Sequence, residues 1–173
     1  GLSLTAIESI TTGTGNDTFT VNDGVAFDGT LDGDTGTDTL DASAYTAALA
    51  IDISAGTLTA PGGATTFANL DTFIGGNNAD TITLGTDPAT IEGSAGDDTY
   101  IFSDGNGNAT ITDSAGTDTF DFSALTSGLS AALDTNSIYT FGGTTINLTG
   151  NTIENVIGTP QADTFTLADG FAL

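Results

Sequence analysis

Aspartates recur at glycine-rich turns with a spacing that could hold metal ions. Six of them end a turn and precede a threonine: Asp17, Asp38, Asp80, Asp98, Asp118 and Asp163. Glycine lies five positions before the aspartate in four of these turns and two positions before it in four, and the turns of Asp38 and Asp98 have both. Carboxylates are hard oxygen ligands, which Ca²⁺ prefers. Glycine adopts positive φ easily, so that backbone carbonyls can also turn inward. The pattern therefore predicts calcium binding at the turns.

The turns differ in how completely they match this pattern. Asp98 and Asp118 are the strongest candidate ligands, helped by Asp80 and by the carbonyls of Gly93–Gly96 and Asp113–Gly116. Asp17 and Asp38, with Asp34 nearby, form a second candidate group. The glycine positions of these turns are held by Gly33, Gly36, Gly93, Gly96 and Gly116. Asp80 and Asp163 have Asn78 and Gln161 where the second glycine is expected, so their turns should bind weakly or not at all.

The charge of the chain agrees with cation binding. The 173 residues include 23 acidic side chains and no Lys, Arg or His, which gives a formal charge of −23. Nothing inside the chain can neutralise this charge, so the folded state must tolerate self-repulsion or recruit cations. Screening by monovalent ions is one answer, but the regular placement of aspartate at turns favours divalent ions. Nucleic acid and anionic membrane surfaces are excluded as partners, because both require Lys or Arg.

Short strands must position these turns. Between residues 75 and 123, five threonine-led runs have the β-branched and aromatic composition of strands: Thr81–Leu84, Thr90–Glu92, Thr99–Phe102, Thr110–Thr112 and Thr119–Phe122. Glycine, aspartate and asparagine separate the runs. Repetition of a short strand and a tight turn is typical of a solenoid. We therefore predict an all-β fold, a right-handed parallel β-solenoid (β-roll or β-helix) with irregular coils of about 18–21 residues.

The repeat organises the whole chain as one continuous domain, residues 1–173. Similar passages lead into Asp17, Asp80 and Asp163, so two long modules are expected at about 1–69 and 70–152, and the start of a third at 153–173. The turn aspartates lie 18 to 21 residues apart within each block, which predicts that one side of the solenoid carries most of them.

Two apolar stretches between the turn-rich blocks also align with each other. They comprise Ala50–Ser54, Gly56–Thr59 and Thr65–Phe67 in one block, and Ala131–Asp134, Ile138–Phe141 and Thr144–Leu148 in the other. Their alternation of apolar and polar residues is strand-like. We expect them to form further coils with longer turns and no calcium sites.

The aligned turns resemble the nonapeptide repeat G-G-x-G-x-D-x-U-x of RTX proteins, whose repeats form a calcium-bound parallel β-roll. The chain departs from this family because its aspartate turns are spaced by about two nonapeptides. The passages around Ile153–Gly158 and Asp121–Ala124 are similar to repeats of very large secreted bacterial surface proteins. That resemblance implies type I secretion, an extracellular or cell-surface location, Ca²⁺ as the cofactor, and a structural or adhesive role.

Two other functions fit parts of the sequence. Asp97 and Asp98 could form a glycosidase pair, but the aspartates are periodic and the chain lacks His, Cys, Lys and Arg, so we expect no enzyme and no catalytic residues. T-x-T pairs such as Thr18/Thr20 and Thr81/Thr83 could order water or bind a ligand, as in ice-binding adhesins. Alternating threonine is also the ordinary polar face of a half-buried strand.

Partners follow from the open ends of a solenoid. The expected first strands, Leu2–Thr5 and Ile7–Ile10, and the last strand, Thr164–Leu167 with Phe171–Leu173 after it, carry no capping pattern. We therefore expect self-association, head-to-tail or as tandem repeats. A cell-surface polysaccharide is a further candidate partner. No run approaches the roughly 20 apolar residues of a membrane span, so no membrane insertion is expected.

Overall fold

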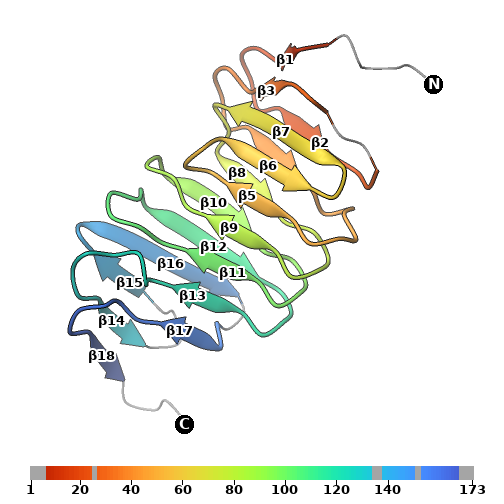
Figure 1. The fold of residues 1–173 in the computed structure, drawn as a ribbon. Helices are drawn as coiled ribbons and strands as arrows, with labels where there is room; N and C mark the ends of the chain where they lie inside the picture. The colour runs from red at the N-terminus through yellow and green to blue at the C-terminus, as the bar shows by residue number, and fades with distance from the viewer. Residues whose placement is uncertain (1–6, 25–26, 134–137, 151–152, 168–173) are drawn as a thin grey trace.

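The chain folds into two long β-sheets that lie against each other along one axis (Figure 1). The computed structural model describes residues 7–24, 27–133, 138–150 and 153–167. Within these ranges every regular element is a β-strand, and each sheet has nine strands. Leu2–Thr5 and Phe171–Leu173 lie outside the described residues.

Both sheets are built mainly from strands of three to five residues. In spatial order, the first sheet contains β1 (Ser9–Thr11), β3 (Thr30–Asp32), β7 (Gly63–Ala68), β6 (Thr57–Ala60), β5 (Ala50–Asp52), β9 (Thr81–Thr83), β11 (Thr99–Ile101), β13 (Thr119–Asp121) and β17 (Asn155–Ile157). The second contains β2 (Thr18–Thr20), β4 (Thr39–Asp41), β8 (Thr72–Ile74), β10 (Ala89–Glu92), β12 (Ala109–Asp113), β16 (Thr144–Gly150), β15 (Ile138–Phe141), β14 (Ser130–Leu133) and β18 (Thr164–Leu167).

Outside β5–β7 and β14–β16, the chain alternates between the two sheets, and neighbouring strands within a sheet pair in parallel. Thr81 of β9, Thr99 of β11 and Thr119 of β13 are aligned partners, so one coil takes 18 to 20 residues here. This arrangement confirms the predicted all-β solenoid. All five strands predicted between residues 75 and 123 are present, to within one or two residues at their ends.

The two apolar stretches do not form further coils, and that prediction was wrong. β5, β6 and β7 form an antiparallel meander within the first sheet, and β14, β15 and β16 form another in the second. Tight turns at Gly56, at Pro61–Gly62 and at Gly142–Gly143 reverse the chain, with positive φ at each of these glycines. A parallel coil needs a crossing to the other sheet, whereas a hairpin needs only a two-residue turn.

Each meander runs backwards along the solenoid. β5 pairs with β9, farther along the axis, and β7 returns to pair with β3. Likewise, β14 pairs with β18 and β16 returns to β12. Since the meanders lie in opposite sheets, each sheet gains two extra strands, and the two sheets begin and end level.

The meander also moves the aspartate turns to the other side of the solenoid. Asp17 and Asp38 lie in turns from the first sheet to the second, whereas Asp80, Asp98 and Asp118 lie in turns from the second to the first. The expectation that one side carries most of these turns is therefore wrong. Three strands in one sheet take the place of one, and the sequence period alone does not reveal this.

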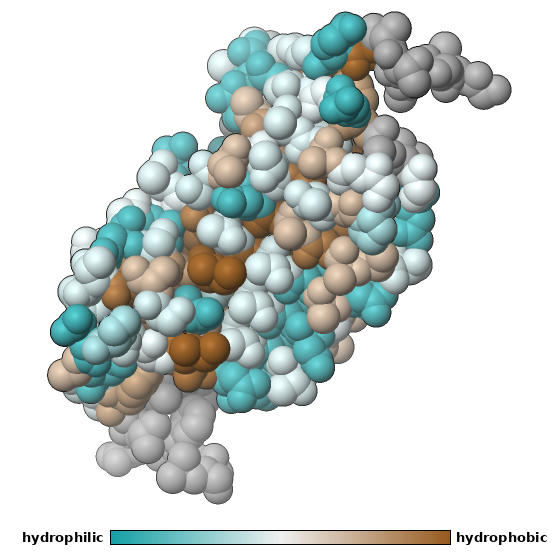
Figure 2. Space-filling view, in the orientation of Figure 1, coloured by the Kyte–Doolittle hydropathy of each residue, from teal (hydrophilic) through white to brown (hydrophobic). Residues whose placement is uncertain are grey.

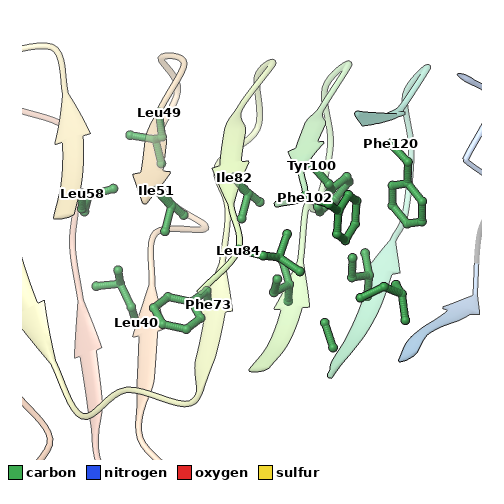
Figure 3. Close-up of a cluster of buried hydrophobic side chains, with 14 of the residues drawn as sticks. Leu40, Leu49, Ile51, Leu58, Phe73, Ile82, Leu84, Tyr100, Phe102 and Phe120 are labelled. Carbon is green, nitrogen blue, oxygen red and sulfur yellow. The ribbon is translucent and has the colours of Figure 1, made fainter. Parts of the chain in front are cut away.

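The core consists of the central residues of the short strands, stacked in columns between the sheets (Figure 3). Ile51, Ile82, Tyr100 and Phe120 are aligned neighbours along the first sheet, and all are fully buried. Leu40, Phe73, Ile91 and Ile111 form the facing column in the second sheet. Burying one such side chain stabilises the fold by roughly 1.5–3 kcal/mol. The core therefore extends along the whole axis.

Glycines two positions before the aspartates allow neighbouring turns to stack. The Gly96 N–H donates to the Ala115 carbonyl (3.0 Å), and the Gly15 N–H donates to the Thr35 carbonyl (2.9 Å). Gly116 has φ of 152°, and a Cβ atom there would lie 1.7 Å from the Gly96 carbonyl oxygen. Only glycine fits this position.

Replacing this glycine should be far more costly than replacing an unstacked one. We expect Gly116→Ala to cost 1–2 kcal/mol for its backbone conformation and roughly a further 1–3 kcal/mol for the overlap with Gly96. Gly105→Ala is the matched control, because Gly105 also has positive φ (83°) but no atom within 4 Å of an added Cβ. Urea denaturation of both variants measures the difference. Equal destabilisation would show that the turns do not stack as described.

Candidate metal centre

A ladder of carboxylates connects consecutive turns along both sides of the solenoid. In each link, a turn N–H of one coil donates to an acidic side chain of the next coil. On one side the links are Asp17 to Asp38 (2.8 Å), Asp38 to Asp71 (2.9 Å) and Leu129 to Asp163 (2.8 Å). On the other they are Leu49 to Asp80 (2.8 Å), Asp80 to Asp98 (2.7 Å), Asp98 to Asp118 (2.8 Å) and Asp118 to Glu154 (2.8 Å).

Most turn aspartates therefore have a structural role that does not need a metal. Asp80 uses its second oxygen to accept the Gly76 N–H (2.6 Å), and Asp163 accepts the Thr159 N–H in the same way (2.9 Å). These two aspartates belong to the turns that lack the second glycine. Both oxygens of each carboxylate already accept hydrogen bonds, so neither group needs a cation to satisfy its oxygens.

The glycine five positions before the aspartate makes room for the carboxylate. A Cβ atom on Gly33 would lie 2.5 Å from Asp38 Oδ2, and one on Gly158 would lie 2.4 Å from Asp163 Oδ2. In the turn that ends at Asp118, this position is occupied by Asp113. A further carboxylate is thus inserted at a position where four of the six turns have glycine.

Asp113 completes a cluster of three buried aspartates. Asp98 and Asp113 are each 1% exposed and Asp118 is 2% exposed. One carboxylate oxygen from each lies within 4.8 Å of the other two. Asp98 and Asp118 come from successive turns, and Asp113 comes from the end of β12. Within the described part of the chain, this is the one place where three acidic side chains converge so closely.

Two oxygens of this cluster have no hydrogen-bond partner. They are Asp98 Oδ2 and Asp113 Oδ1, both fully shielded from solvent. The other Asp113 oxygen accepts a hydrogen bond from the Tyr100 hydroxyl at 2.5 Å. Gly93 lies against the same group, since a Cβ atom there would be 2.1 Å from the Tyr100 hydroxyl and 2.6 Å from Asp98 Oδ2. Buried oxygens without a partner are costly, and a bound cation, a proton or a water molecule would satisfy them.

Burial raises the proton affinity of the whole cluster. Desolvation, with the nearby charges of Asp113, Asp80 and Asp118, raises the pKa of Asp98 to about 7. Desolvation, with the charges of Asp113, Glu154 and Asp97, raises the pKa of Asp118 to about 6. The pKa of Asp113 is raised mainly by desolvation, against the lowering effects of the Tyr100 hydroxyl and of the Ser114 and Ala115 backbone N–H groups. The pKa of Tyr100 is also raised by burial, so its hydroxyl keeps its proton.

This arrangement can hold a cation. Three carboxylates within 4.8 Å, and two oxygens without donors, form a site of oxygen ligands only. No Lys, Arg or His exists in the chain to pair with them. A metal ion or retained protons must therefore compensate the buried charge. Oxygen-only ligands are typical of Ca²⁺, Mg²⁺ and Mn²⁺ sites rather than of zinc or copper sites.

The structure brings together only part of the residue set predicted from the sequence. Asp98, Asp118 and Gly93 meet at the cluster. Asp80 lies one coil away, linked through its own N–H to Asp98. Gly96 and Gly116 shape the stacked turns.

The second candidate group lies on the opposite side of the solenoid. Asp38 is buried, and its Oδ2 has no partner. Asp17 donates to Asp38 through its backbone, whereas Asp34 is exposed. Asp34, Gly36 and Asp38 line a cavity of about 350 Å³ beside the first meander. No group of three close carboxylates forms there among the described residues.

Sequence reasoning included Asp113 only through its backbone carbonyl, and it missed the Asp113 carboxylate, Tyr100 and Glu154. The sequence did contain a signal for Asp113, since it is an aspartate at a position where four of the six turns have glycine. Tyr100 is the only tyrosine among the central residues of the predicted strands, where phenylalanine or isoleucine is usual. Glu154 accepts the Asp118 N–H and so takes the place of a turn aspartate in the ladder.

No protein-family model matches the chain, and a search of curated proteins finds no match. The RTX-like pattern of the turns therefore remains a resemblance. The described residues include no helix that is long and apolar enough to cross a bilayer.

The raised pKa values predict an unusual dependence of stability on pH. The pKa of Asp98 is about 7 in the folded chain and about 4 in the unfolded chain. Between these values, the folded state binds more protons than the unfolded state. Without metal, the free energy of unfolding should therefore rise as the pH falls from about 8 to about 5. Thermal melts in chelator across this range measure it.

Asp98→Asn should remove part of this dependence and stabilise the metal-free chain at about pH 8, since it removes a buried charge while keeping an acceptor for the Asp80 N–H. Asp52→Asn is the control, because Asp52 only accepts the Ala55 N–H in an exposed turn. A melting temperature that falls steadily on acidification from pH 8 would contradict the raised pKa values.

Proposed function

We propose that this chain is a calcium-stabilised structural segment of an extracellular fibre, sheath, surface layer or adhesin. The observation that carries the proposal is the buried group of Asp98, Asp113 and Asp118, with two shielded oxygens that lack donors. Millimolar Ca²⁺ outside cells would supply the positive charge that the sequence lacks. The resemblance of the turns to RTX repeats agrees with this choice of ion.

Calcium suits the site better than magnesium does. Ca²⁺ accepts six to eight oxygen ligands in flexible geometry, whereas Mg²⁺ demands a near-ideal octahedron and keeps several waters. The three carboxylates here are fixed by the turn ladder and by Tyr100. A rigid, dry group of carboxylates favours the ion that gives up its water more easily.

A structural role fits the rest of the molecule. The core is a continuous column, and the repeated turns join each coil to the next on both sides. Asp97 and Asp98 do not form a facing pair, because Asp97 is exposed and accepts the Thr117 N–H (2.9 Å), whereas Asp98 is buried. This separation favours a non-enzymatic role.

On the second sheet, the threonines form one continuous outward column rather than two. Thr18, Thr39, Thr72, Thr90 and Thr110 are aligned on the second sheet. The adjacent column reads Thr20, Asp41, Ile74, Glu92 and Thr112. Because a flat two-column array is interrupted here, ice or ligand binding through T-x-T pairs is a weaker proposal than a structural role.

Calcium titration of the metal-free chain tests the proposal. Calorimetry should detect binding, and Asp98→Asn and Asp113→Asn should each weaken it about tenfold or more, equivalent to about 1.4 kcal/mol. Asp52→Asn removes the same charge from an exposed turn and should leave the affinity unchanged. Binding should also raise the melting temperature of the wild-type chain.

Two results would contradict the proposal that the cluster binds Ca²⁺. Equal weakening in all three variants would indicate diffuse screening of the charge rather than a site. A melting temperature that is the same in millimolar Ca²⁺ and in chelator would show that the ion is not structural.

A further inference from the structure

The two ends of the solenoid expose hydrophobic residues that are buried elsewhere. Among the described residues, the large hydrophobic side chains that are exposed are Ile7 (37%), Ile157 (47%) and Phe165 (42%). Ile7 precedes β1, and Ile157 and Phe165 lie on β17 and β18, so all three belong to the first or last coil. On the flank seen in Figure 2, hydrophobic residues form small separate spots rather than one patch.

The ends also present unpaired strand edges. β1 pairs only with β3 and β2 only with β4, whereas β17 pairs only with β13 and β18 only with β14, within the described residues. Such edges are templates for pairing with another chain. At the N-terminal end, Ile10, Phe19, Val21, Phe27 and Leu31 line a cavity of about 260 Å³.

The first and last coils are copies of each other in sequence. Ile7-Glu8-Ser9-Ile10 corresponds to Ile153-Glu154-Asn155-Val156, and Asp17-Thr18-Phe19-Thr20 to Asp163-Thr164-Phe165-Thr166. They also occupy the same sheets, with β1 and β17 in the first and β2 and β18 in the second. The middle copy, around Asp80, occupies the opposite sheets, since β8 lies in the second and β9 in the first. The spatial repeat is therefore the whole solenoid.

We infer that the C-terminal end of one chain pairs in parallel with the N-terminal end of a second copy, β17 with β1 and β18 with β2. The register follows from the coils in which turn aspartates stack, where the residues directly after these aspartates align. It pairs Thr164 with Thr18, Phe165 with Phe19, and Thr166 with Thr20. Phe165 then lies over Phe19, beside the N-terminal cavity.

The free edges of β2 and β18 present backbone N–H and C=O groups from complementary residues. The Thr39 N–H donates to the Asp17 carbonyl and the Val21 N–H to the Asp41 carbonyl, so Asp17, Phe19 and Val21 face β4. Groups of successive residues alternate in direction along a strand. Thr18 and Thr20 of β2 therefore face the free edge.

At the other end, the Thr164 N–H donates to the Leu129 carbonyl, toward β14. Asp163 and Phe165 accordingly face the free edge of β18. With these residues directed to the free edges, β2 of a second copy can pair with β18 in the same way as β4 pairs with β2.

The carboxylate ladder has matching ends too. The Asp163 N–H has no acceptor among the described residues, and the Asp17 carboxylate has no donor there. In the proposed stack, the Asp163 N–H donates to Asp17 of the next copy, as Asp17 donates to Asp38. Because each sheet has nine strands, the two sheets end at the same level, and the pairs β17–β1 and β18–β2 can form together.

The contact is heterologous, so it produces an open filament rather than a closed dimer. With nine strands in each sheet, each copy adds about 43 Å at a strand spacing of about 4.8 Å. Repulsion between chains of charge −23 opposes the contact, so association is expected at physiological salt, where the screening length is about 8 Å. The inference extends the structural role proposed above, but it does not depend on the metal.

Cysteine cross-linking tests the register. The chain has no cysteine. In the variant Thr20→Cys/Thr166→Cys, the two thiols should meet between copies at a Cα separation of about 4.8 Å, which a disulfide can span. Oxidation should then give covalent dimers, trimers and longer chains. Thr90→Cys/Thr166→Cys is the mismatched control, because Thr90 lies on β10 in the middle of the second sheet, and it should give several-fold fewer products.

Sedimentation of cysteine-free chains supplies the second readout. The wild-type chain should form oligomers that grow with concentration. Phe165→Asp should be monomeric, whereas Thr90→Asp, which adds the same charge away from the ends, should associate like the wild type. Circular dichroism confirms that each variant is folded.

The inference is overturned by equal cross-linking of the two cysteine pairs, or by a wild-type chain that stays monomeric at several hundred micromolar. Both experiments are run with Ca²⁺ and with chelator. Cross-linking without calcium binding would refute the proposed metal and keep the stack, and calcium binding without cross-linking would do the reverse.

Discussion

The fold depends on a hydrogen bond that is repeated from coil to coil, in which a turn N–H donates to the carboxylate of the next turn. A parallel solenoid leaves turn N–H groups pointing along its axis, and these groups need acceptors. Aspartate supplies an acceptor on a short side chain, and the glycine five residues earlier leaves room for it. One residue type therefore satisfies the backbone and sets the spacing of the coils. Its cost is an accumulation of negative charge in a chain without cations.

Negative charge is most concentrated at the buried cluster of Asp98, Asp113 and Asp118. Elsewhere, no turn gathers three carboxylates among the described residues, and at Asp80 and Asp163 the second oxygen accepts a local N–H. At Asp118 the preceding turn position carries Asp113, and Asp98 lies one coil away. Three charges then share one dry space, and Tyr100 satisfies only one of the oxygens. The local excess of charge distinguishes this turn from the others and makes it the candidate metal centre.

Much of this fold could be predicted from the sequence, because the short strands have a strong local signature. Threonine, a large apolar residue and a third polar or apolar residue recur before each turn, and the middle side chain is buried as expected. The meanders could not be predicted in the same way. Ala50–Ser54 alternates equally well as a coil or as a hairpin strand, and only pairing with β9 and β6 distinguishes them. For the same reason, the exchange of turn sides after Asp38 was not visible.

The candidate site was predicted in part. Asp98 and Asp118 followed from the repeat, since aligned turns stack in space. Asp113 did not follow, because it departs from the repeat, and its proximity to Asp98 depends on how β12 enters its turn. Asp17, Asp38 and Asp163 match the same pattern and belong to the ladder of hydrogen bonds. No cluster of three carboxylates forms around them among the described residues. The repeat pattern therefore predicts the positions of the turn carboxylates. Whether three of them come together depends on residues that depart from the repeat, such as Asp113.

A crystal structure of the chain grown with Tb³⁺ in place of Ca²⁺ tests the central claim most directly, because the anomalous signal locates the ion without reference to the protein. The account predicts one strong peak between Asp98, Asp113 and Asp118, with metal–oxygen distances of about 2.3–2.6 Å. A structure with no peak there, and with two of these carboxyl groups joined by a short hydrogen bond, would show that the cluster holds protons and no metal.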